Sequence, residues 1–173
     1  MPVFPEVLSR RKVGSPERWM AHLGHQEALQ ITRGVRIGDE FHVHSTFWVD
    51  RSRVPVFATM PLRQMAGENF KHLIFRACGQ AIHKVDLFTR QEVRPREVSG
   101  LLNIPARQLC SSLRVQAFMG KSDPIYYQQI FTPPNICELH IVQTAVLQDF
   151  RHKRDTHIGR AGLLAPLRSC GSS

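Results

Sequence analysis

Residues 27–49, EALQITRGVRIGDEFHVHSTFWV, predict the first half of the fold. Two extended arms flank a polar turn at residues 38–40, which is the pattern of a β-hairpin. Because successive side chains of a strand point to opposite faces, the second arm presents two different surfaces. One face carries Phe41, Val43, Ser45 and Phe47, and the other carries His42, His44, Thr46 and Trp48.

A second hairpin is predicted over residues 108–134, QLCSSLRVQAFMGKSDPIYYQQIFTPP. Its turn lies at residues 120–123, and on its second arm Gln129 shares a face with Tyr127 and Phe131. One face of its first arm carries Leu109, Ser111, Leu113, Val115, Ala117 and Met119.

Helices are predicted before and between the hairpins. A short helix opens at residues 15–17 and ends at Gly24, and the principal helix spans residues 61–79, with Gly79 placed to end it. A strand over residues 81–93, a short helix over 95–104 and a strand over 137–147 complete the order. Two hairpins separated by helices predict an α+β domain, with helices packed on one side of an antiparallel β-sheet.

One domain is expected over residues 15–150, because a chain of 173 residues suits a single core. Residues 1–14 are predicted to be an N-terminal tail, and residues 151–173 a disordered tail without sustained periodicity. No apolar run approaches the ~20 residues of a membrane helix, and no secretory signal opens the chain. We therefore expect a cytoplasmic protein with no membrane partner.

Charge and histidine content leave alternatives open. The formal net charge of +9 suits a phosphate partner, but the basic clusters SRRK and RHKR lie near the two ends, so solvated tails are a simpler explanation than a nucleic-acid surface. His42 and His44 share a strand face and could meet one metal ion, or contact water or a ligand instead. The four cysteines form no close pair, and we predict neither a metal nor a cofactor.

No phosphate-binding loop, GxGxxG motif or GxSxG motif is present. The order of three weaker patterns is more informative: VRIGDEF at residues 35–41, LLNIP at 101–105 and DPIYYQQIF at 123–131. In this order, with a helix between the hairpins, residues 16–141 resemble the UTRA domain, the ligand-sensing half of HutC-type regulators in the GntR superfamily. That domain shares its fold with chorismate lyase.

The resemblance bears on catalysis. Chorismate lyase uses an arginine in the first hairpin and a glutamate in the second, and the matching positions here are Thr46 and Gln129. Threonine carries no charge to hold a carboxylate, and a glutamine amide does not exchange a proton near neutral pH. We therefore expect no catalytic residue and no enzyme, with a divergent lyase that releases pyruvate from chorismate as the alternative.

The resemblance implies a small-molecule effector site on the strands. The predicted ligand-binding residues are Arg33, Arg36, His44, Thr46, Tyr127 and Gln129, which supply cationic, imidazole, hydroxyl, aromatic and amide groups. Another interpretation makes Tyr127, Phe131 and Trp48 core residues, and the arginines solvated strand ends.

The resemblance also implies partners. UTRA domains commonly dimerise through their sheets, so a homodimer is expected. In the family, DNA is bound by a winged helix-turn-helix, which the fifteen residues before the first predicted helix are too few to form. DNA contact is therefore expected only through a winged-helix domain absent from this chain, which would be a regulator without its DNA-binding half, a stand-alone binding domain or a fragment.

Overall fold

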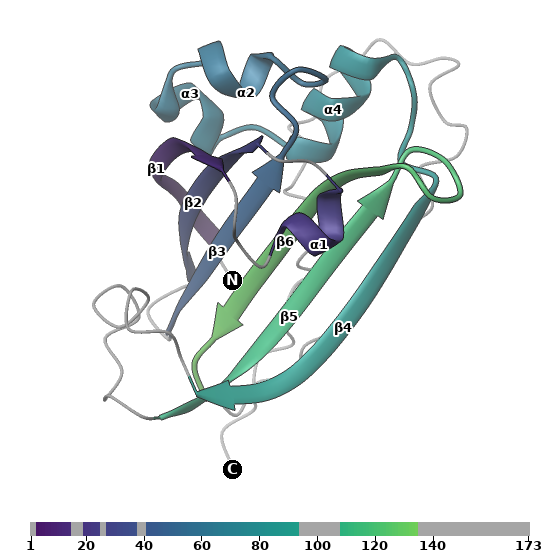
Figure 1. Ribbon diagram of the computed structural model, residues 1–173. Coiled ribbons are helices and arrows are strands. Elements are labelled where there is room, and N and C mark those ends of the chain that lie inside the picture. Colours follow the sequence, from purple (N-terminus) through teal and green to yellow (C-terminus); the bar gives the residue numbers. More distant parts are fainter. Residues whose placement is uncertain (1–2, 15–18, 25–26, 38–40, 94–107, 135–173) are drawn as a thin grey trace, which may run out of the picture.

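One antiparallel sheet organises the molecule (Figure 1). The computed structural model describes residues 3–14, 19–24, 27–37, 41–93 and 108–134. The strands are β1 (Val3–Gly14), β2 (Glu27–Ile37), β3 (Phe41–Val49), β4 (Lys84–Val93), β5 (Leu109–Phe118) and β6 (Pro124–Thr132). The helices are α1 (Met20–Leu23), α2 (Val56–Thr59), α3 (Leu62–Ala66) and α4 (Phe70–Cys78). The six strands follow the order β1-β2-β3-β6-β5-β4, which confirms the predicted α+β class.

Both predicted hairpins are present. β2 pairs with β3, and β5 pairs with β6, in each case antiparallel. The two hairpins join through β3 and β6, so residues far apart in the sequence become direct neighbours in the sheet. The strand predicted over residues 81–93 is β4, which pairs with β5 and comes last in the order of the described strands.

Residues 3–14 differ from the predicted tail. Residues 3–14 form β1, which pairs with β2 along its length, with a bulge after Val7. Val7 and Val13 are buried. The basic residues of this segment suggested a solvated tail, but Arg10 donates to the carbonyl oxygens of Phe57 and Met60 in the α2 region, at 3.0 and 2.6 Å.

The predicted principal helix is divided into α3 and α4. Asn69 is the N-cap of α4, and its side chain accepts hydrogen bonds from the backbone nitrogens of Lys71 and His72, at 3.0 and 3.4 Å. This cap satisfies amides at the start of the second helix, so a new helix begins here. Gly79 ends α4 as predicted, with a φ of 68° in the left-handed region that glycine adopts readily.

The main core lies between the sheet and helices α2–α4. Phe47 of β3 packs against Phe57 of α2 and Phe70 of α4, with ring centroids 5.5 and 5.0 Å away. The two helical phenylalanines are 4.8 Å apart, edge to face. Aliphatic side chains of the sheet, including Leu29 and Val49, complete this apolar cluster.

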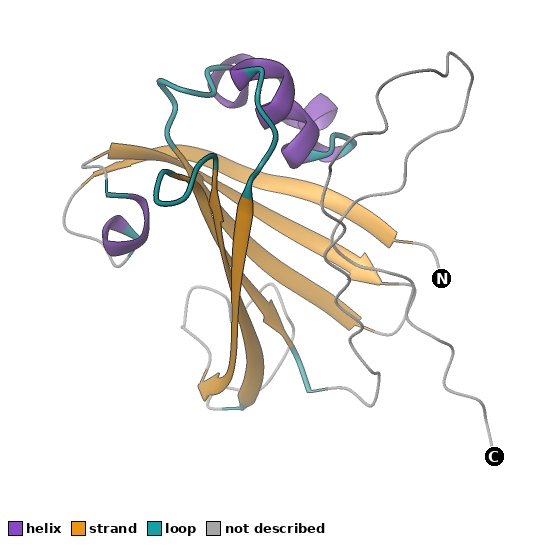
Figure 2. Ribbon diagram, turned by 90° about the vertical axis from the view of Figure 1, so that its right-hand side faces the viewer, coloured by secondary structure: helices purple, strands orange, loops and turns teal. Residues whose placement is uncertain are grey.

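A second, smaller cluster holds α1 on the other face of the sheet. Trp19 and Leu23 pack there with Val13, Ala28 and Tyr127, and Figure 2 shows α1 apart from the other three helices. The prediction that the helices lie on one side therefore describes α2–α4, whereas α1 lies opposite. Both faces of the central strands are consequently covered in part, and β3 carries buried residues on both of its faces.

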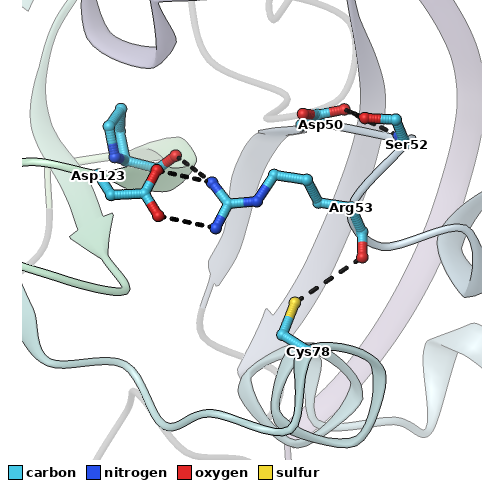
Figure 3. A network of polar contacts seen from close by, with 6 residues as sticks. Asp50, Ser52, Arg53, Cys78 and Asp123 are labelled. Carbon is cyan, nitrogen blue, oxygen red and sulfur yellow. Dashed lines mark hydrogen bonds and ion pairs between the residues drawn. The ribbon is translucent and has the colours of Figure 1, made fainter.

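A polar network fixes the entry to the helices against the second hairpin (Figure 3). Arg53, before α2, donates through both terminal nitrogens to the carboxylate of Asp123 in the β5–β6 turn, at 2.8 and 2.9 Å. Cys78 at the end of α4 donates to the carbonyl oxygen of Arg53, at 3.7 Å. Asp50 and Ser52 close a local turn beside it.

Several predicted segments lie outside the described residues. These are the turn at residues 38–40, the short helix over 95–104, the strand over 137–147 and the tail over 151–173. Among the helices that the structure describes, none is long and apolar enough to cross a membrane.

Candidate functional site

The face of the sheet opposite α2–α4 gathers polar side chains from five strands, and we call it the polar face. We define it by Thr32, His44, Thr46, Trp48, Glu92, Ser112, Arg114, Gln116, Tyr127 and Gln129. These residues share one face because they occupy alternate positions along their strands or directly opposite positions on neighbouring strands. The side of the sheet opposite the main core is therefore rich in hydrogen-bonding groups, beside the smaller cluster that holds α1.

A single row of this face runs across four strands. Thr32 of β2 lies opposite Thr46 of β3, Thr46 lies opposite Gln129 of β6, and Gln129 lies opposite Arg114 of β5. Directly opposite side chains of antiparallel strands have Cβ atoms about 5 Å apart. One small molecule lying across the row could therefore contact hydroxyl, amide and guanidinium groups together.

Three buried polar atoms of this face have no hydrogen-bond partner among the described residues. They are Nδ1 of His44, Nε1 of Trp48 and Nε of Arg114. Buried polar atoms are nearly always paired in native proteins, and an unpaired one costs about 1–3 kcal/mol. The indole and guanidinium atoms are donors, so an acceptor-bearing ligand would pair them.

Gln129 is held at the centre of the row. Its side-chain nitrogen donates to Oε1 of Glu92 and to Oγ of Ser112, both at 3.3 Å. Ser112 is fully buried and Thr46 is 8% exposed. The amide is therefore oriented by the adjacent strand β5 and by β4 beyond it before any ligand arrives.

Charge on the polar face comes from Glu92, Arg90 and Arg114. Burial acts to raise the pKa of Glu92, but hydrogen bonds from Ser112 and Arg90 and the charge of Arg90 outweigh it, so the pKa is lowered. Arg114 lies over the ring of Phe88, 5.5 Å from its centroid. Glu92 is thus ionised and already bonded to Arg90, whereas the structure describes no ion pair for Arg114.

Aromatic stacking joins α1 to the polar face. His22 of α1 stacks on Tyr127, with ring centroids 4.3 Å apart and planes 11° apart, and Trp48 stacks near Tyr127 at 5.4 Å. Gln116 donates to the carbonyl oxygen of His22 at 2.6 Å. Burial and then the charge of Arg114 lower the pKa of His22. The short helix is therefore docked directly beside the polar row.

The structure brings five of the six predicted site residues to one side of the sheet. His44, Thr46, Tyr127 and Gln129 belong to the polar face, and the pairing of Arg36 with His42 puts Arg36 on the same side, where it is exposed. Burial lowers the pKa of His44 to about 4, so its imidazole is neutral at neutral pH.

Arg33 lies on the other side of the sheet. It pairs with Ser45, and its guanidinium lies 4.4 Å from the ring centroid of Phe70 in α4. Burial lowers its pKa. Arg33 and Arg36 are three positions apart in one strand, so they face opposite sides, and this spacing was visible in the sequence.

Sequence reasoning missed Arg114 and Glu92. The most regular pattern of the β5 segment is its apolar face, whereas Arg114 lies on the other face with Ser112 and Gln116. Glu92 becomes relevant only through its contact with Gln129, which depends on the β4–β5 and β5–β6 registers. Alternation could have placed Arg114 on the polar side, but no local signal reveals the contact of Glu92.

The described segments contain no group of three or more histidine, cysteine or acidic side chains arranged to hold a metal ion. His44 is buried and His42 is exposed on the same strand. Of the alternatives for this histidine pair, the geometry leaves His44 beside the polar row as a group that a ligand could contact.

The fold is that of the ligand-binding domains of GntR-family transcriptional regulators. A GntR-family regulator from Bacillus cereus superposes with a TM-score of 0.68 at 16% identity, over 82% of this chain and 99% of that chain. The C-terminal domain of histidine utilization repressor from Pseudomonas syringae gives 0.66 at 13% identity, over 83% and 99%. The effector domain of PhnF from Mycobacterium smegmatis gives 0.63 at 13% identity, over 75% and 80%. No protein-family model and no curated protein matches the chain.

Proposed function

We propose that this chain is a small-molecule effector-binding domain of a GntR/HutC-type transcriptional regulator. The observation that carries the proposal is the set of unpartnered buried atoms on His44, Trp48 and Arg114, beside the row through Thr46 and Gln129. A ligand bound across this row would satisfy them. Solved neighbours that are described as ligand-binding or effector domains support the same role.

The ligand would be small and rich in acceptor oxygens. Arg114 and Trp48 present donors, Thr46 can donate or accept, and the amide of Gln129 is fixed in place. The rings of Trp48 and Tyr127 form an aromatic wall beside these groups. Such a mixture of a few directional polar groups with aromatic surface is typical of small-molecule sites.

The proposal is tested by a thermal-shift screen with chorismate, 4-hydroxybenzoate, urocanate, sugar phosphates and common amino acids. A ligand at about a hundred times its Kd adds about 2.7 kcal/mol, which for a domain of this size raises Tm by about 5–10 °C. Gln129→Ala should abolish the shift. Gln128→Ala is the matched control, since Gln128 is the next residue, faces the other way and donates to Ser45 at 2.7 Å.

Two results would contradict this function. If the protein is stable and none of these compounds raises its Tm, there is no reason to call the domain a sensor. A shift that survives in Gln129→Ala but disappears in Gln128→Ala would put the ligand on the core side of the sheet.

We also propose that the domain carries out no catalysis. Gln129 donates to the carboxylate of Glu92, whose lowered pKa and bonds to Arg90 and Ser112 keep it ionised, so Glu92 is a poor proton donor. Incubation with chorismate should give no pyruvate above the background rate. Pyruvate release that Gln129→Ala reduces would show that the domain is a lyase instead.

DNA binding in this proposal belongs to a separate winged-helix domain of a cytoplasmic regulator. This chain should therefore not bind duplex DNA in a gel-shift assay at low salt. Retardation that weakens steeply as salt is added would instead assign the positive charge of the chain to a nucleic-acid surface.

A further inference from the structure

The short helix α1 borders one end of the polar row. Figure 1 shows this helix against β6, and its apolar anchors Trp19 and Leu23 are 2% and 1% exposed. His22, next to Leu23, is only partly buried. Its ring stacks on Tyr127 with centroids 4.3 Å apart, and Gln116 of β5 donates to its carbonyl oxygen. The imidazole is therefore fixed over the sheet, with part of its surface in solvent.

Arg114 is the cationic neighbour of this imidazole. It precedes Gln116 by two positions in β5, so both side chains lie on the polar face, about 7 Å apart along the strand. Burial and then the charge of Arg114 lower the pKa of His22. Burial raises the pKa of Tyr127, and the charge and hydrogen bond of Arg114 oppose this rise. The guanidinium is thus close enough to act on both stacked rings.

The acidic side chains on the polar side of β4 are already neutralised. Asp86 accepts a hydrogen bond from Lys84 at 2.8 Å, and Glu92 is bonded to Arg90. Each of these carboxylates is therefore paired with a cation of its own strand. Among the described residues no ion pair is found for Arg114, so its positive charge is left without a counter-ion.

The guanidinium of Arg114 also has unused donor capacity. Its central carbon lies 5.5 Å from the ring centroid of Phe88, but an aromatic ring offers no oxygen or nitrogen acceptor. Nε of Arg114 is buried and has no hydrogen-bond partner among the described residues. A guanidinium with donors to spare is suited to the oxygens of a carboxylate or a phosphate.

Charged and titratable groups surround α1 on the polar side of the sheet. They are Arg114 of β5, Tyr127 of β6, Asp86 of β4 and Arg11 of β1, whereas the side chains that β2 and β3 place there, Ala28 and Trp48, do not titrate. Asp86 is paired with Lys84, and Arg11 donates to Gln30 at 3.2 Å. Within these described strands, no unpaired carboxylate is left to balance a protonated His22. A bound acid group would balance His22 and Arg114 together.

We infer that the effector carries an acid group, a carboxylate or a phosphate, and that Arg114 and the protonated imidazole of His22 hold this group at the α1 end of the polar row. The inference rests on the small-molecule site proposed above. It assigns the chemical class of the ligand, and it adds His22, a residue outside the sheet, to the binding residues. The remainder of the ligand would lie along Gln129 and Thr46.

Binding of an acid group should take up a proton at His22. Without a ligand, burial and the charge of Arg114 lower the pKa of this imidazole, so it is neutral at pH 7.5. A bound anion favours the charged form, so the pKa of His22 is higher in the complex than in the free protein. The anion should therefore bind more tightly as pH falls. We expect a gain of about tenfold in affinity between about pH 7.5 and pH 5.5, which corresponds to a pKa difference of about one.

Sodium sulfate and sodium acetate are the probes, because each presents an acid group without the rest of a ligand. The full chain is titrated with each at about pH 7.5 and pH 5.5, with the ionic strength held constant by sodium chloride. Binding is followed by NMR through the backbone amides of Arg114 and Tyr127. At least one anion should bind saturably, and about tenfold more tightly at the lower pH. Tighter binding of sulfate would indicate a phosphate group on the effector, and tighter binding of acetate a carboxylate.

His22→Phe separates the charge of the imidazole from its packing. Phenylalanine keeps a ring on Tyr127 but takes up no proton, so this variant should bind the anion like the wild type at the higher pH and gain no affinity at the lower pH. Arg114→Gln should weaken binding about tenfold or more at both pH values. His72→Gln is the matched control, since it removes an exposed histidine of α4 on the other side of the sheet. It should retain the full pH dependence.

The outcomes distinguish this inference from the effector function. If neither anion shifts the two amides, or if Arg114→Gln binds the anions as tightly as the wild type, the acid site does not exist. A pH dependence that His22→Phe retains would assign the proton to another group and remove His22 from the site. If a compound from the thermal-shift screen binds and neither anion competes with it, the effector function stands and the acid site is wrong. If the anions bind as expected and the screen yields no ligand, the acid site stands and the effector function is wrong.

Discussion

His44 should make the unfolding free energy of this protein depend on pH. The dependence should lie between the pKa of the imidazole in the folded chain and its pKa in the unfolded chain. The residue is 5% exposed in β3, and burial lowers its pKa from the usual 6.5 to about 4. As pH falls, the unfolded chain binds a proton at this residue first, whereas the folded chain keeps the imidazole neutral. The contribution of the neutral His44 to the unfolding free energy is therefore complete above the pKa of the unfolded chain. It is lost as pH approaches 4.

The size of the effect follows from linkage. Each pKa unit of difference is worth about 1.4 kcal/mol, so moving from about pH 7.5 to pH 5 should remove about 2 kcal/mol of unfolding free energy through His44 alone. Urea unfolding at several pH values measures this loss, with the slope m checked for constancy. His44→Gln should lack this part of the pH dependence.

His42→Gln is the matched control, because it is the same exchange two residues away on the same strand at an exposed position. It should retain the full pH dependence of the wild type. If His44→Gln and the wild type lose the same unfolding free energy between these pH values, the imidazole of His44 is solvated in the folded protein and the reasoning fails.

Three further predictions concern stability and are measured by urea unfolding. Phe47→Ala should cost about 3–5 kcal/mol, because the ring packs against two other phenylalanines in the core; a loss below 1 kcal/mol would mean that this core is loosely packed. Gly79→Ala should cost about 1 kcal/mol, since φ is 68°, whereas Gly120→Ala, with no atom within 4 Å of the added Cβ, should be nearly neutral. Asp123→Ala should cost less than about 1 kcal/mol, because its side chain is 56% exposed in the ion pair with Arg53; a larger loss would show that the turn depends on this pair.

Local patterns in the sequence were sufficient to predict the two hairpins. They were not sufficient for elements that depend on pairing between distant segments of the chain. Alternation and turn residues are properties of adjacent positions, so both hairpins and β4 could be predicted. β1 could not, because its pairing with β2 outweighs the preference of three successive basic residues for solvent. The break between α3 and α4 was missed although Asn69 is a favoured N-cap residue.

The candidate site shows the same limit. The sequence placed Thr46 with His44, and Gln129 with Tyr127, because alternation acts within one strand. That Thr46 and Gln129 lie opposite one another depends on the β3–β6 register, which no local pattern specifies. The odd spacing of Arg33 and Arg36 already puts the two arginines on opposite faces of one strand, so alternation alone decides which side Arg33 occupies.

The pairing of β3 with β6 has a consequence for folding. It joins residues 44–49 to residues 126–131, so it closes a long segment of chain and should form after the two local hairpins. Neither hairpin alone contains the row from Thr32 to Arg114. The protein should therefore bind a ligand only after the two halves of the sheet have paired. Ligand binding would then report completion of the fold during refolding.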